Sequence, residues 1–231
     1  MALYIQKKLK NGAILGVWRI EESEEELQRS LDLPEEVLQE IALYRSEQHR
    51  REKLSVLALL REMLGRTVQL GHHETGSPYI ENDGTHISIT HTTMFSAVIL
   101  HPTKDVGIDI ESVKRDFSAV EKKALSEEEK DDLIKLDEED AEDDEKVQER
   151  NTQLALYWCA KEALYKRMGR FAVNFAEDIE IEHFNVREDG ELEASFKYSD
   201  QLSGEQDEEN VEDFDLRYEI FEDHALVWLV G

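Results

Sequence analysis

Two carboxylates stand inside an otherwise apolar segment, residues 105–111, whose sequence is DVGIDIE. Its three aliphatic residues alternate, which predicts a β-strand with those side chains on one face. Asp109 and Glu111 then share the opposite face, because successive side chains of a strand point to opposite sides. Acidic residues are poor strand formers and a buried unpaired carboxylate is costly. A solvated sheet face, basic side chains and a bound cation are the three ways to compensate them.

The spacing of Asp109 and Glu111 suits a hard cation. Their positions on one strand face are separated by about 6.5–7 Å, so the two side chains can converge on one ion. An all-oxygen pair suits Mg²⁺ or Mn²⁺, and Mg²⁺ usually takes few protein carboxylates together with substrate phosphates. The competing interpretation is an edge strand with both acids in water. Taken alone, Asp-x-Glu favours that interpretation, because so short a motif recurs by chance.

A second group of chemically capable residues lies at 157–166, YWCAKEALYK, in a segment with helical periodicity. Trp158, Glu162 and Tyr165 are spaced to share one helix face, and Glu162 and Lys166 form an i, i+4 pair. A surface ion pair beside an apolar stripe is the commonest use of this spacing. A partly buried Glu with an adjacent Lys would instead suit a metal–phosphate site. Both interpretations remain open for this segment alone.

The third candidate is His91, in the segment SITHTT at 88–93. It directly follows a predicted strand, where it could contact a phosphate, bind a metal or simply end the strand. Cys159 is the single cysteine, which excludes an internal disulfide and suits a reducing cytoplasm. We interpret it as a small buried helix residue and not as a nucleophile.

The elements that must position these residues follow from periodicity, caps and turns. Helices are expected from a Ser23–Glu26 capping box through Leu31, over 35–44, up to Gly65, from Ser126 towards Leu136, and over about 150–169. Strands are expected at 13–20, 86–90, 95–100 and 105–111, with loop and short strand in the turn-rich stretch before residue 86, and antiparallel strands in the C-terminal third. The pattern predicts an α+β fold with two similar halves.

The net charge of −27 is concentrated in two segments. Residues 127–149 hold 14 Asp/Glu against 3 Lys/Arg, and residues 177–223 hold 19 against 3. The rest of the chain is balanced and leaves room for a basic surface. The run 137–145 has no apolar face, and we expect a mobile, solvated excursion there. No apolar run approaches the roughly 20 residues of a membrane-spanning helix, and the N-terminus lacks a signal pattern, so export is not indicated.

Three motifs occur in a particular order: a Gly-x-Pro turn followed by a strand and His, then GIDIE, then WxxKEAxxK. Over about residues 45–170 this order resembles the 4′-phosphopantetheinyl transferase superfamily, specifically the long Sfp-type (surfactin-synthetase-activating) with both halves in one chain. The resemblance implies two related α+β halves with the active site at their interface. The expected division is 1–104, contributing to coenzyme A binding, and 105–231, carrying the metal-binding carboxylates and an acidic insert at about 137–149.

The resemblance also implies an activity. Such enzymes move the phosphopantetheine arm of coenzyme A to a serine of an apo acyl or peptidyl carrier protein and release 3′,5′-ADP. Mg²⁺ is the implied metal, with Mn²⁺ possible, and coenzyme A is the co-substrate. The implied enzyme is a cytoplasmic monomer without nucleic-acid or membrane partners. A non-catalytic coenzyme A- or nucleotide-binding protein and a metal-dependent phosphohydrolase are the alternatives.

The site residues are carried over position by position. The resemblance places the metal on Asp109, Glu111 and Glu162, and either Glu162 or a metal-bound water would accept the serine proton. The residues expected at coenzyme A and its phosphates are Arg51, Ser77, Pro78, Thr90, His91, Lys161 and Lys166.

Two departures from the family pattern stand out. Threonines flank His91 where serines are usual, and Ser77 stands where lysine is common. The acidic run 137–145 also falls where an acidic carrier protein is expected to dock, so it should repel the carrier or lie aside.

Overall fold

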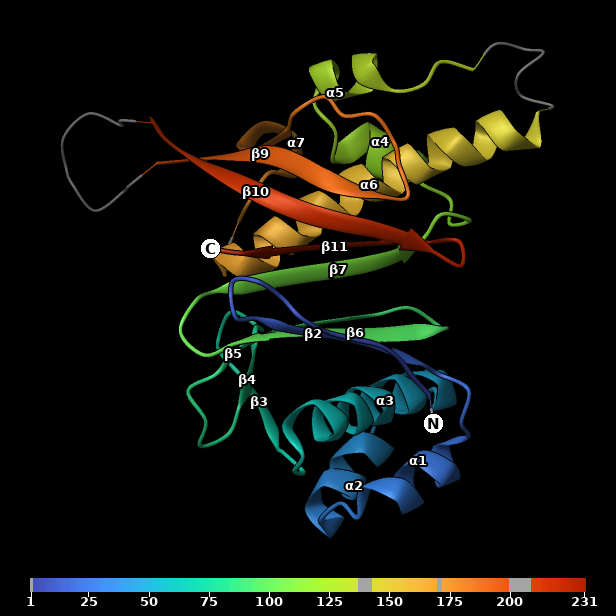
Figure 1. Ribbon diagram of the computed structural model, residues 1–231, viewed down its shortest axis with the longest axis vertical. Helices are drawn as coiled ribbons and strands as arrows, with labels where there is room; N and C mark the ends of the chain where they lie inside the picture. Colours follow the sequence, from blue (N-terminus) through green and yellow to red (C-terminus); the bar gives the residue numbers. More distant parts are fainter. Residues whose placement is uncertain (1, 137–142, 170–171, 200–208) are drawn as a thin grey trace. The chain divides into compact units, whose positions relative to one another are not determined.

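The computed structural model describes residues 2–136, 143–169, 172–199 and 209–231 (Figure 1). The fold is mixed α+β, as the sequence pattern predicts. The chain divides into two compact units. The N-terminal unit comprises Met1–Ile110 with Val230–Gly231, and the C-terminal unit comprises Glu111–Leu229. The division falls between Ile110 and Glu111, inside the strand that carries Asp109 and Glu111. The expected boundary lies before this strand, between residues 104 and 105.

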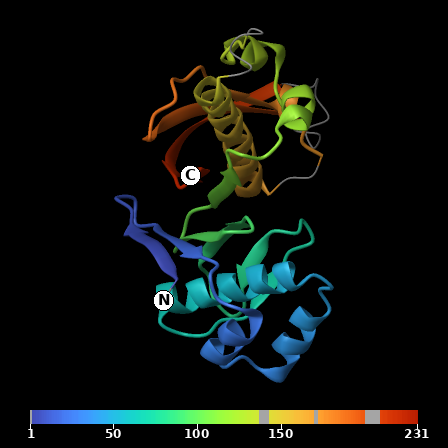
Figure 2. The ribbon, with the colours of Figure 1, turned by 90° about the vertical axis from the view of Figure 1, so that its right-hand side faces the viewer.

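The N-terminal unit is built on an antiparallel sheet with the order β1-β2-β6-β5. Helix α3 packs on this sheet, and it lies between the sheet and helices α1 and α2 (Figures 1 and 2). The elements are β1 (Leu3–Lys8), β2 (Ile14–Arg19), α1 (Glu24–Leu31), α2 (Glu35–Ala42), α3 (Glu47–Leu64), β3 (Leu70–His72), β4 (Pro78–Ile80), β5 (His86–His91), β6 (Phe95–His101) and β7 (Val106–Ser112).

The close approach of α3 to the sheet depends on one glycine. A Cβ at Gly16 of β2 would lie 2.6 Å from Met63 Sδ and 2.8 Å from a Leu59 methyl, so these two side chains would have to shift to admit a larger residue. The helix ends as predicted at Gly65, whose φ of +67° is the left-handed conformation that glycine adopts at low cost. This packing fixes the helix that carries Glu52.

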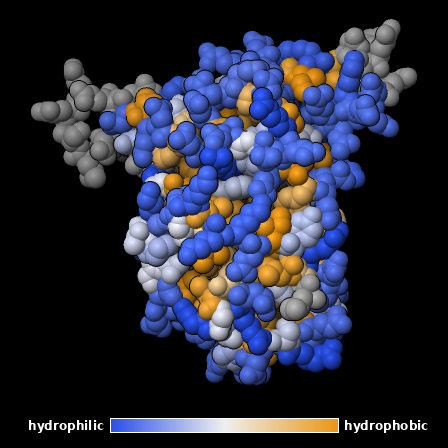
Figure 3. Space-filling view, viewed as in Figure 1, coloured by the Kyte–Doolittle hydropathy of each residue, from blue (hydrophilic) through white to orange (hydrophobic). Residues whose placement is uncertain are grey.

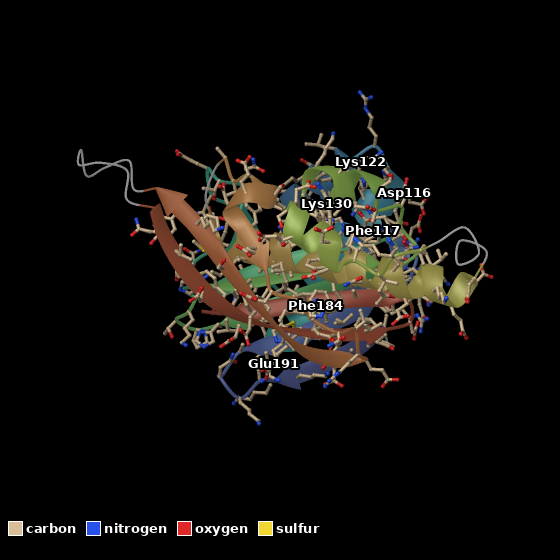
Figure 4. The ribbon with its side chains drawn as sticks, turned by 90° about the horizontal axis from the view of Figure 1, so that it is seen from above. Asp116, Phe117, Lys122, Lys130, Phe184 and Glu191 are labelled. Carbon is tan, nitrogen blue, oxygen red and sulfur yellow. The ribbon has the colours of Figure 1, made fainter. Side chains whose placement is uncertain are left out.

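The C-terminal unit contains α4 (Ser118–Lys123), α5 (Glu127–Asp132), α6 (Asp144–Met168), α7 (Phe175–Asp178), β8 (Ile179–Ile181), β9 (Asp189–Ser199), β10 (Glu209–Phe221) and β11 (His224–Val230). The five-stranded sheet has the order β7-β11-β10-β9-β8, and β7 is the strand within which the units divide. The apolar face of α6 shares a core with β8 to β11. Figure 4 shows this unit with Asp116 and Phe117 at the segment leading into α4 and Lys130 on α5.

The predicted capping boxes are confirmed. Ser23 accepts the backbone N–H of Glu26, and the Glu26 side chain accepts that of Ser23. Ser126 and Glu129 make the same reciprocal pair at the start of α5. Helix α5 is shorter than expected, because it ends at Asp132 and not near Leu136.

Helix α6 begins earlier than the expected residue 150. Asp143 caps it, and its carboxylate accepts the backbone N–H groups of Glu145 and Lys146. Residues 144–149 of the predicted acidic insert are therefore helical, because an acidic first turn is favourable at a helix N-terminus even without an apolar face. The rest of the predicted excursion, residues 137–142, lies outside the described residues. Strand β1 and helix α4 were not predicted from the sequence.

Two further expectations concern surface and core. Within the described ranges, no helix is both long and apolar enough to cross a bilayer. The face shown in Figure 3 is largely hydrophilic, with hydrophobic residues scattered over it. Cys159 is fully buried, and its thiol donates to the carbonyl oxygen of Ala225 at 3.6 Å. The prediction of a buried helix cysteine is confirmed.

Candidate active site

Strand β7 is largely buried and is not a solvent-exposed sheet edge. Residues 106–110 are all buried, and Asp109 is 5% exposed. Its Oδ1 accepts a hydrogen bond of 2.8 Å from the Thr90 hydroxyl of β5. The predicted strand is correct, but the water-facing interpretation is wrong for Asp109. Glu111, two residues on, has a side chain that is 21% exposed.

Two hydroxyls of β5 hold this part of β7. The backbone N–H of Ile108 donates to Ser88 Oγ at 3.2 Å, and that of Ile110 donates to Thr90 Oγ1 at 3.3 Å. Thr90 thus accepts from the β7 backbone and donates to the Asp109 carboxylate. Thr90 is buried, and its hydroxyl is engaged with Asp109 and the β7 backbone. A hydroxyl pair spaced by two in a strand was the available signal, but the sequence does not show which strand it faces.

Glu111 forms an ion pair with Arg115, which lies four residues further along the chain, after the end of β7. The Arg115 guanidinium also lies over two rings, 5.6 Å from the centroid of Phe117 and 5.8 Å from that of Trp158. A cation over an aromatic face is attracted by the ring quadrupole, which holds the guanidinium in place. Because Trp158 belongs to α6, Arg115 joins the end of β7 to the helix that carries Glu162. The sequence reasoning missed Arg115.

The shared face of α6 is confirmed. Trp158, Glu162 and Tyr165 are each partly exposed, while the residues between them are buried. The Trp158 and Tyr165 rings both pack against Phe175, with centroid separations of 5.6 and 5.4 Å. Lys166 is also partly exposed, one turn after Glu162. Glu162 is therefore held on a rigid helix between two anchored aromatic side chains.

Lys161 points away from that face. It is 0% exposed, and its Nζ donates to the carbonyl oxygens of Phe175 at 2.7 Å and Ile179 at 2.6 Å. Its third contact is the Glu129 carboxylate at 2.8 Å. Burial lowers the pKa of the Lys161 ammonium, and Glu129 opposes that shift. An ammonium has three N–H donors, and these contacts use all three. The observed role is structural, which argues against the expected contact with coenzyme A.

Glu129 completes this buried cluster. Besides capping α5, it accepts the backbone N–H of Ile181 at 2.9 Å and is 2% exposed in its side chain. A buried pair is tolerable when its remaining hydrogen-bonding capacity is satisfied, as it is here. The Glu129–Lys161 pair therefore fastens α5 and β8 to α6, the helix that carries Glu162 and Lys166.

His91 lies at the end of β5, with 38% of its side chain exposed. Its Nδ1 is 3.4 Å from Oε2 of Glu52, a residue of α3 that is 5% exposed. Gln48 donates from Nε2 to the same Glu52 carboxylate at 3.0 Å. The sequence reasoning passed over Glu52, because in RREKL it looks like one charge among several. Only the tertiary contact singles it out.

The other residues expected at coenzyme A lie elsewhere in the N-terminal unit. Arg51 donates to the carbonyl oxygens of Glu22 at 2.9 Å and Ile20 at 3.3 Å. A guanidinium has five N–H donors, so these bonds do not exhaust it. Ser77 and Pro78 belong to the β3–β4 hairpin, where Ser77 Oγ lies 2.9 Å from Thr75 Oγ1. The structure confirms a turn there.

The donor set fits a hard cation in chemistry. Among the described residues, no group of three or more His, Cys, Asp or Glu side chains is arranged to hold a metal ion. Asp109 and Glu111 nevertheless offer oxygen ligands from one strand face. Mg²⁺ is commonly bound by one or two carboxylates with substrate phosphates, so two carboxylates fit the ion when a phosphate-bearing ligand completes its shell.

Comparison with known proteins bears on the region just described. The model of the 4′-phosphopantetheinyl transferase superfamily matches residues 105–223, just over half of the chain. The match includes β7 with Asp109 and Glu111, and helix α6 with Glu162 and Lys166. No match was found among curated proteins. With its buried β7 carboxylate and the ordered face of α6 inside the matched region, the chain belongs to the 4′-phosphopantetheinyl transferase superfamily.

Proposed function

We propose that this protein transfers the 4′-phosphopantetheine arm of coenzyme A to a serine of an apo carrier protein and releases 3′,5′-ADP. We further propose that it is of the long type with two related halves in one chain. Family membership supports the reaction class. The observation that carries the proposal is Asp109, a 5% exposed carboxylate that Thr90 holds on β7 within the matched region. Burying a carboxylate is costly, and such groups are concentrated at functional sites.

The metal in this proposal is Mg²⁺, with Mn²⁺ as a substitute. Asp109 and Glu111 would hold it, and Glu162 is the third carboxylate that the proposal assigns to it. When bound, the ion supplies positive charge that neutralises the oxygens of the coenzyme A pyrophosphate. In the structure, Glu111 is paired with Arg115. Binding would exchange the guanidinium of Arg115 for the cation at this carboxylate.

The chain's own residues would then perform the transfer. The serine oxygen of the carrier forms a bond to the phosphorus next to the pantetheine, and the bond from that phosphorus to the leaving ADP oxygen breaks. In the proposal, either Glu162 or a metal-bound water accepts the serine proton, and Lys166, one helical turn after Glu162, adds positive charge at the departing phosphate. Both side chains project from the partly exposed face of α6.

Coenzyme A binding is assigned to the N-terminal unit. We propose that His91, Arg51 and the turn at Ser77 and Pro78 contact the nucleotide end. Thr90 acts through Asp109, since its hydroxyl is engaged with β7. Lys161 acts through the packing of α6, since its ammonium is buried in bonds to the protein. These two residues are positioning residues in the proposal.

Mass spectrometry tests the proposal. The full chain is incubated with coenzyme A, Mg²⁺ and an apo carrier protein, and the acceptor should gain roughly 340 Da as a phosphopantetheine phosphoester forms on serine. Release of phosphopantetheine or phosphate without an acceptor would show a phosphohydrolase instead. Coenzyme A binding with neither product would show a binding protein. A panel of fatty-acid, polyketide and peptide-synthetase carriers would identify the preferred acceptor.

Asp109→Asn tests the site within the same assay. The amide keeps the shape and the acceptor oxygen for Thr90 but removes the charge, so we expect transfer to fall by more than the roughly 10- to 100-fold typical of outer-shell residues at metal sites. The matched control is Asp105→Asn, because Asp105 is an exposed carboxylate at the start of the same segment, paired with His86. Near-normal turnover of Asp109→Asn in saturating Mg²⁺ would contradict the assignment.

A further inference from the structure

Glu52 is a buried carboxylate that the proposed mechanism does not use. It is the first buried residue of α3, just before the run of the helix that enters the apolar core, and is 5% exposed. Burying an ionised carboxylate is costly unless hydrogen bonds or an opposite charge compensate it. In the described part of the chain, Gln48 donates to it from the same helix and His91 Nδ1 faces it from β5. The titratable partner of this carboxylate is therefore the histidine of the proposed coenzyme A site.

The surroundings of the Glu52–His91 pair are rigid. Gln48 donates from Nε2 both to Glu52 and to the carbonyl oxygen of Thr93 at 3.1 Å, just beyond the end of β5. One turn further along α3, the buried hydroxyls of Ser55 and Ser96 lie 2.6 Å apart. Ser96 of β6 is the register partner of His91. Polar links on both sides of Glu52 thus fix α3 against the strand end that carries His91.

A carboxylate that faces one nitrogen of an imidazole determines what the other nitrogen presents. It favours a proton on the facing nitrogen and fixes the orientation of the ring, as carboxylates do for histidines in many binding sites. Here Glu52 faces Nδ1, and the ring is 38% exposed at its position. A fully structural histidine would not need to reach the surface, and a fully exposed one would not need a buried carboxylate.

We propose that Glu52 is a positioning residue for coenzyme A: it holds the proton on His91 Nδ1 and directs Nε2 towards a phosphate of the ligand. The inference deepens the proposed function and rests on it for the identity of the ligand. Glu52 itself does not touch the ligand. Its effect on binding passes through His91, and this distinguishes it from a residue that merely stabilises α3.

The first measurement needs neither ligand nor turnover. Long-range ¹H–¹⁵N NMR of the ligand-free full chain reports the tautomer of His91, with His91→Gln used to assign its signals. Glu52→Met removes the carboxylate at similar volume, and Glu52→Gln keeps an acceptor oxygen without the charge. We expect the Nδ1-protonated signature in the parent chain, its loss in Glu52→Met and an intermediate result in Glu52→Gln. Identical His91 signals in all three chains would overturn the proposal. If Glu52→Met does not fold, Glu52→Gln carries the comparison.

The second measurement reads coenzyme A itself. Isothermal titration should show affinity falling by about 10- to 100-fold in Glu52→Met, the range typical of second-layer residues. In the transfer assay the loss should appear in KM and leave kcat nearly unchanged. Glu62→Gln is the control, because Glu62 is an exposed acid of the same helix.

A double-variant comparison separates positioning from structural support. In a His91→Gln background, Glu52→Met should cause no further loss of affinity, because its effect passes through the missing ring. An undiminished second loss would overturn the proposal. A protein that shows the predicted tautomer change but no transfer would contradict the proposed function and leave the Glu52–His91 relation standing. Transfer with unchanged His91 signals would support the proposed function and contradict the Glu52–His91 relation.

Discussion

The two units of this protein each bury a charge on a long helix but compensate it differently. Each has one long helix packed on antiparallel strands, α3 in the N-terminal unit and α6 in the C-terminal unit. Lys161 of α6 is compensated entirely inside the protein, by two backbone carbonyls and Glu129. Glu52 of α3 is compensated by Gln48 and by a histidine that reaches the surface. A fully enclosed charge fastens elements together, whereas a charge paired with an accessible group can act on a ligand.

The largest effect that tests this comparison is expected at Lys161. Lys161→Met leaves Glu129 buried without its counter-charge, and removing one partner of a buried pair costs about 3–5 kcal/mol of unfolding free energy. Urea denaturation followed by circular dichroism measures the loss. Lys135→Met is the control, because its side chain is 68% exposed and its ion pair with Asp131 is a surface pair. If the two variants lost equal stability, the buried contacts of Lys161 would not hold α5 and β8 against α6.

Replacing both partners sharpens the same point. Glu129→Gln combined with Lys161→Met removes the uncompensated charge while the amide can still accept the N–H of Ile181. We expect the double variant to be more stable than Lys161→Met alone, since a buried pair replaced as a whole is often close to neutral. A double variant as unstable as the sum of its single changes would show that the two residues act independently.

Glu52 should respond in the opposite way. Glu52→Gln is expected to cost no more than about 1.5 kcal/mol of unfolding free energy, because the amide keeps a hydrogen bond and removes a desolvated charge. The same denaturation experiment compares it with Lys161→Met. The prediction is that Glu52 matters more to coenzyme A affinity than to stability. A stability loss as large as that of Lys161→Met would make Glu52 a structural residue like its counterpart in α6.

The smallest effect concerns His224, another buried ionisable group. Burial lowers the pKa of His224 from its ordinary value of 6.5 in the folded protein. The unfolded chain therefore binds the proton more readily, so the stability contribution is complete above about pH 6.5 and is lost as the pH falls below it. The slope from one such group is at most about 1.4 kcal/mol per pH unit. His224→Asn should flatten the stability profile between pH 6.5 and 5, measured by urea denaturation at each pH. A variant profile parallel to that of the parent chain would contradict the assignment.

The sequence predicted helix ends and strands well where the pattern depends on residues close together in the chain. The capping boxes at Ser23 and Ser126, the end of α3 at Gly65 and the alternation of β7 all depend on residues a few positions apart. The start of α6 was missed because its first turns are acidic and show no apolar period. That turn is stabilised by the Asp143 cap and by charge at a helix N-terminus, which a search for periodicity does not detect.

The site was predictable in its motifs but not in the division of labour among its residues. Asp109 and Glu111 were found from their spacing, and Glu162 from the helix face that it shares with Trp158. Lys161 and Lys166 look equivalent in the sequence. Each residue of a helix is rotated by about 100° from the one before it, so the two side chains lie on different sides of α6. The roles of Thr90 and Glu52 depend on strands and helices that are distant in the chain. Such non-local contacts leave no periodic trace in one sequence.

The two hydroxyls of β5 have a consequence for the register of β7. Asp-x-Glu repeats a carboxylate every second residue, so sliding β7 by two positions would keep every side chain on its proper face and place Glu111 where Asp109 belongs. Hydrophobic patterning alone does not distinguish these two alignments. Ser88 and Thr90 accept the N–H groups of Ile108 and Ile110, and Thr90 also donates to the shorter acid. These hydroxyls of β5, a strand of the other sheet, therefore favour the shorter aspartate over glutamate at the buried position.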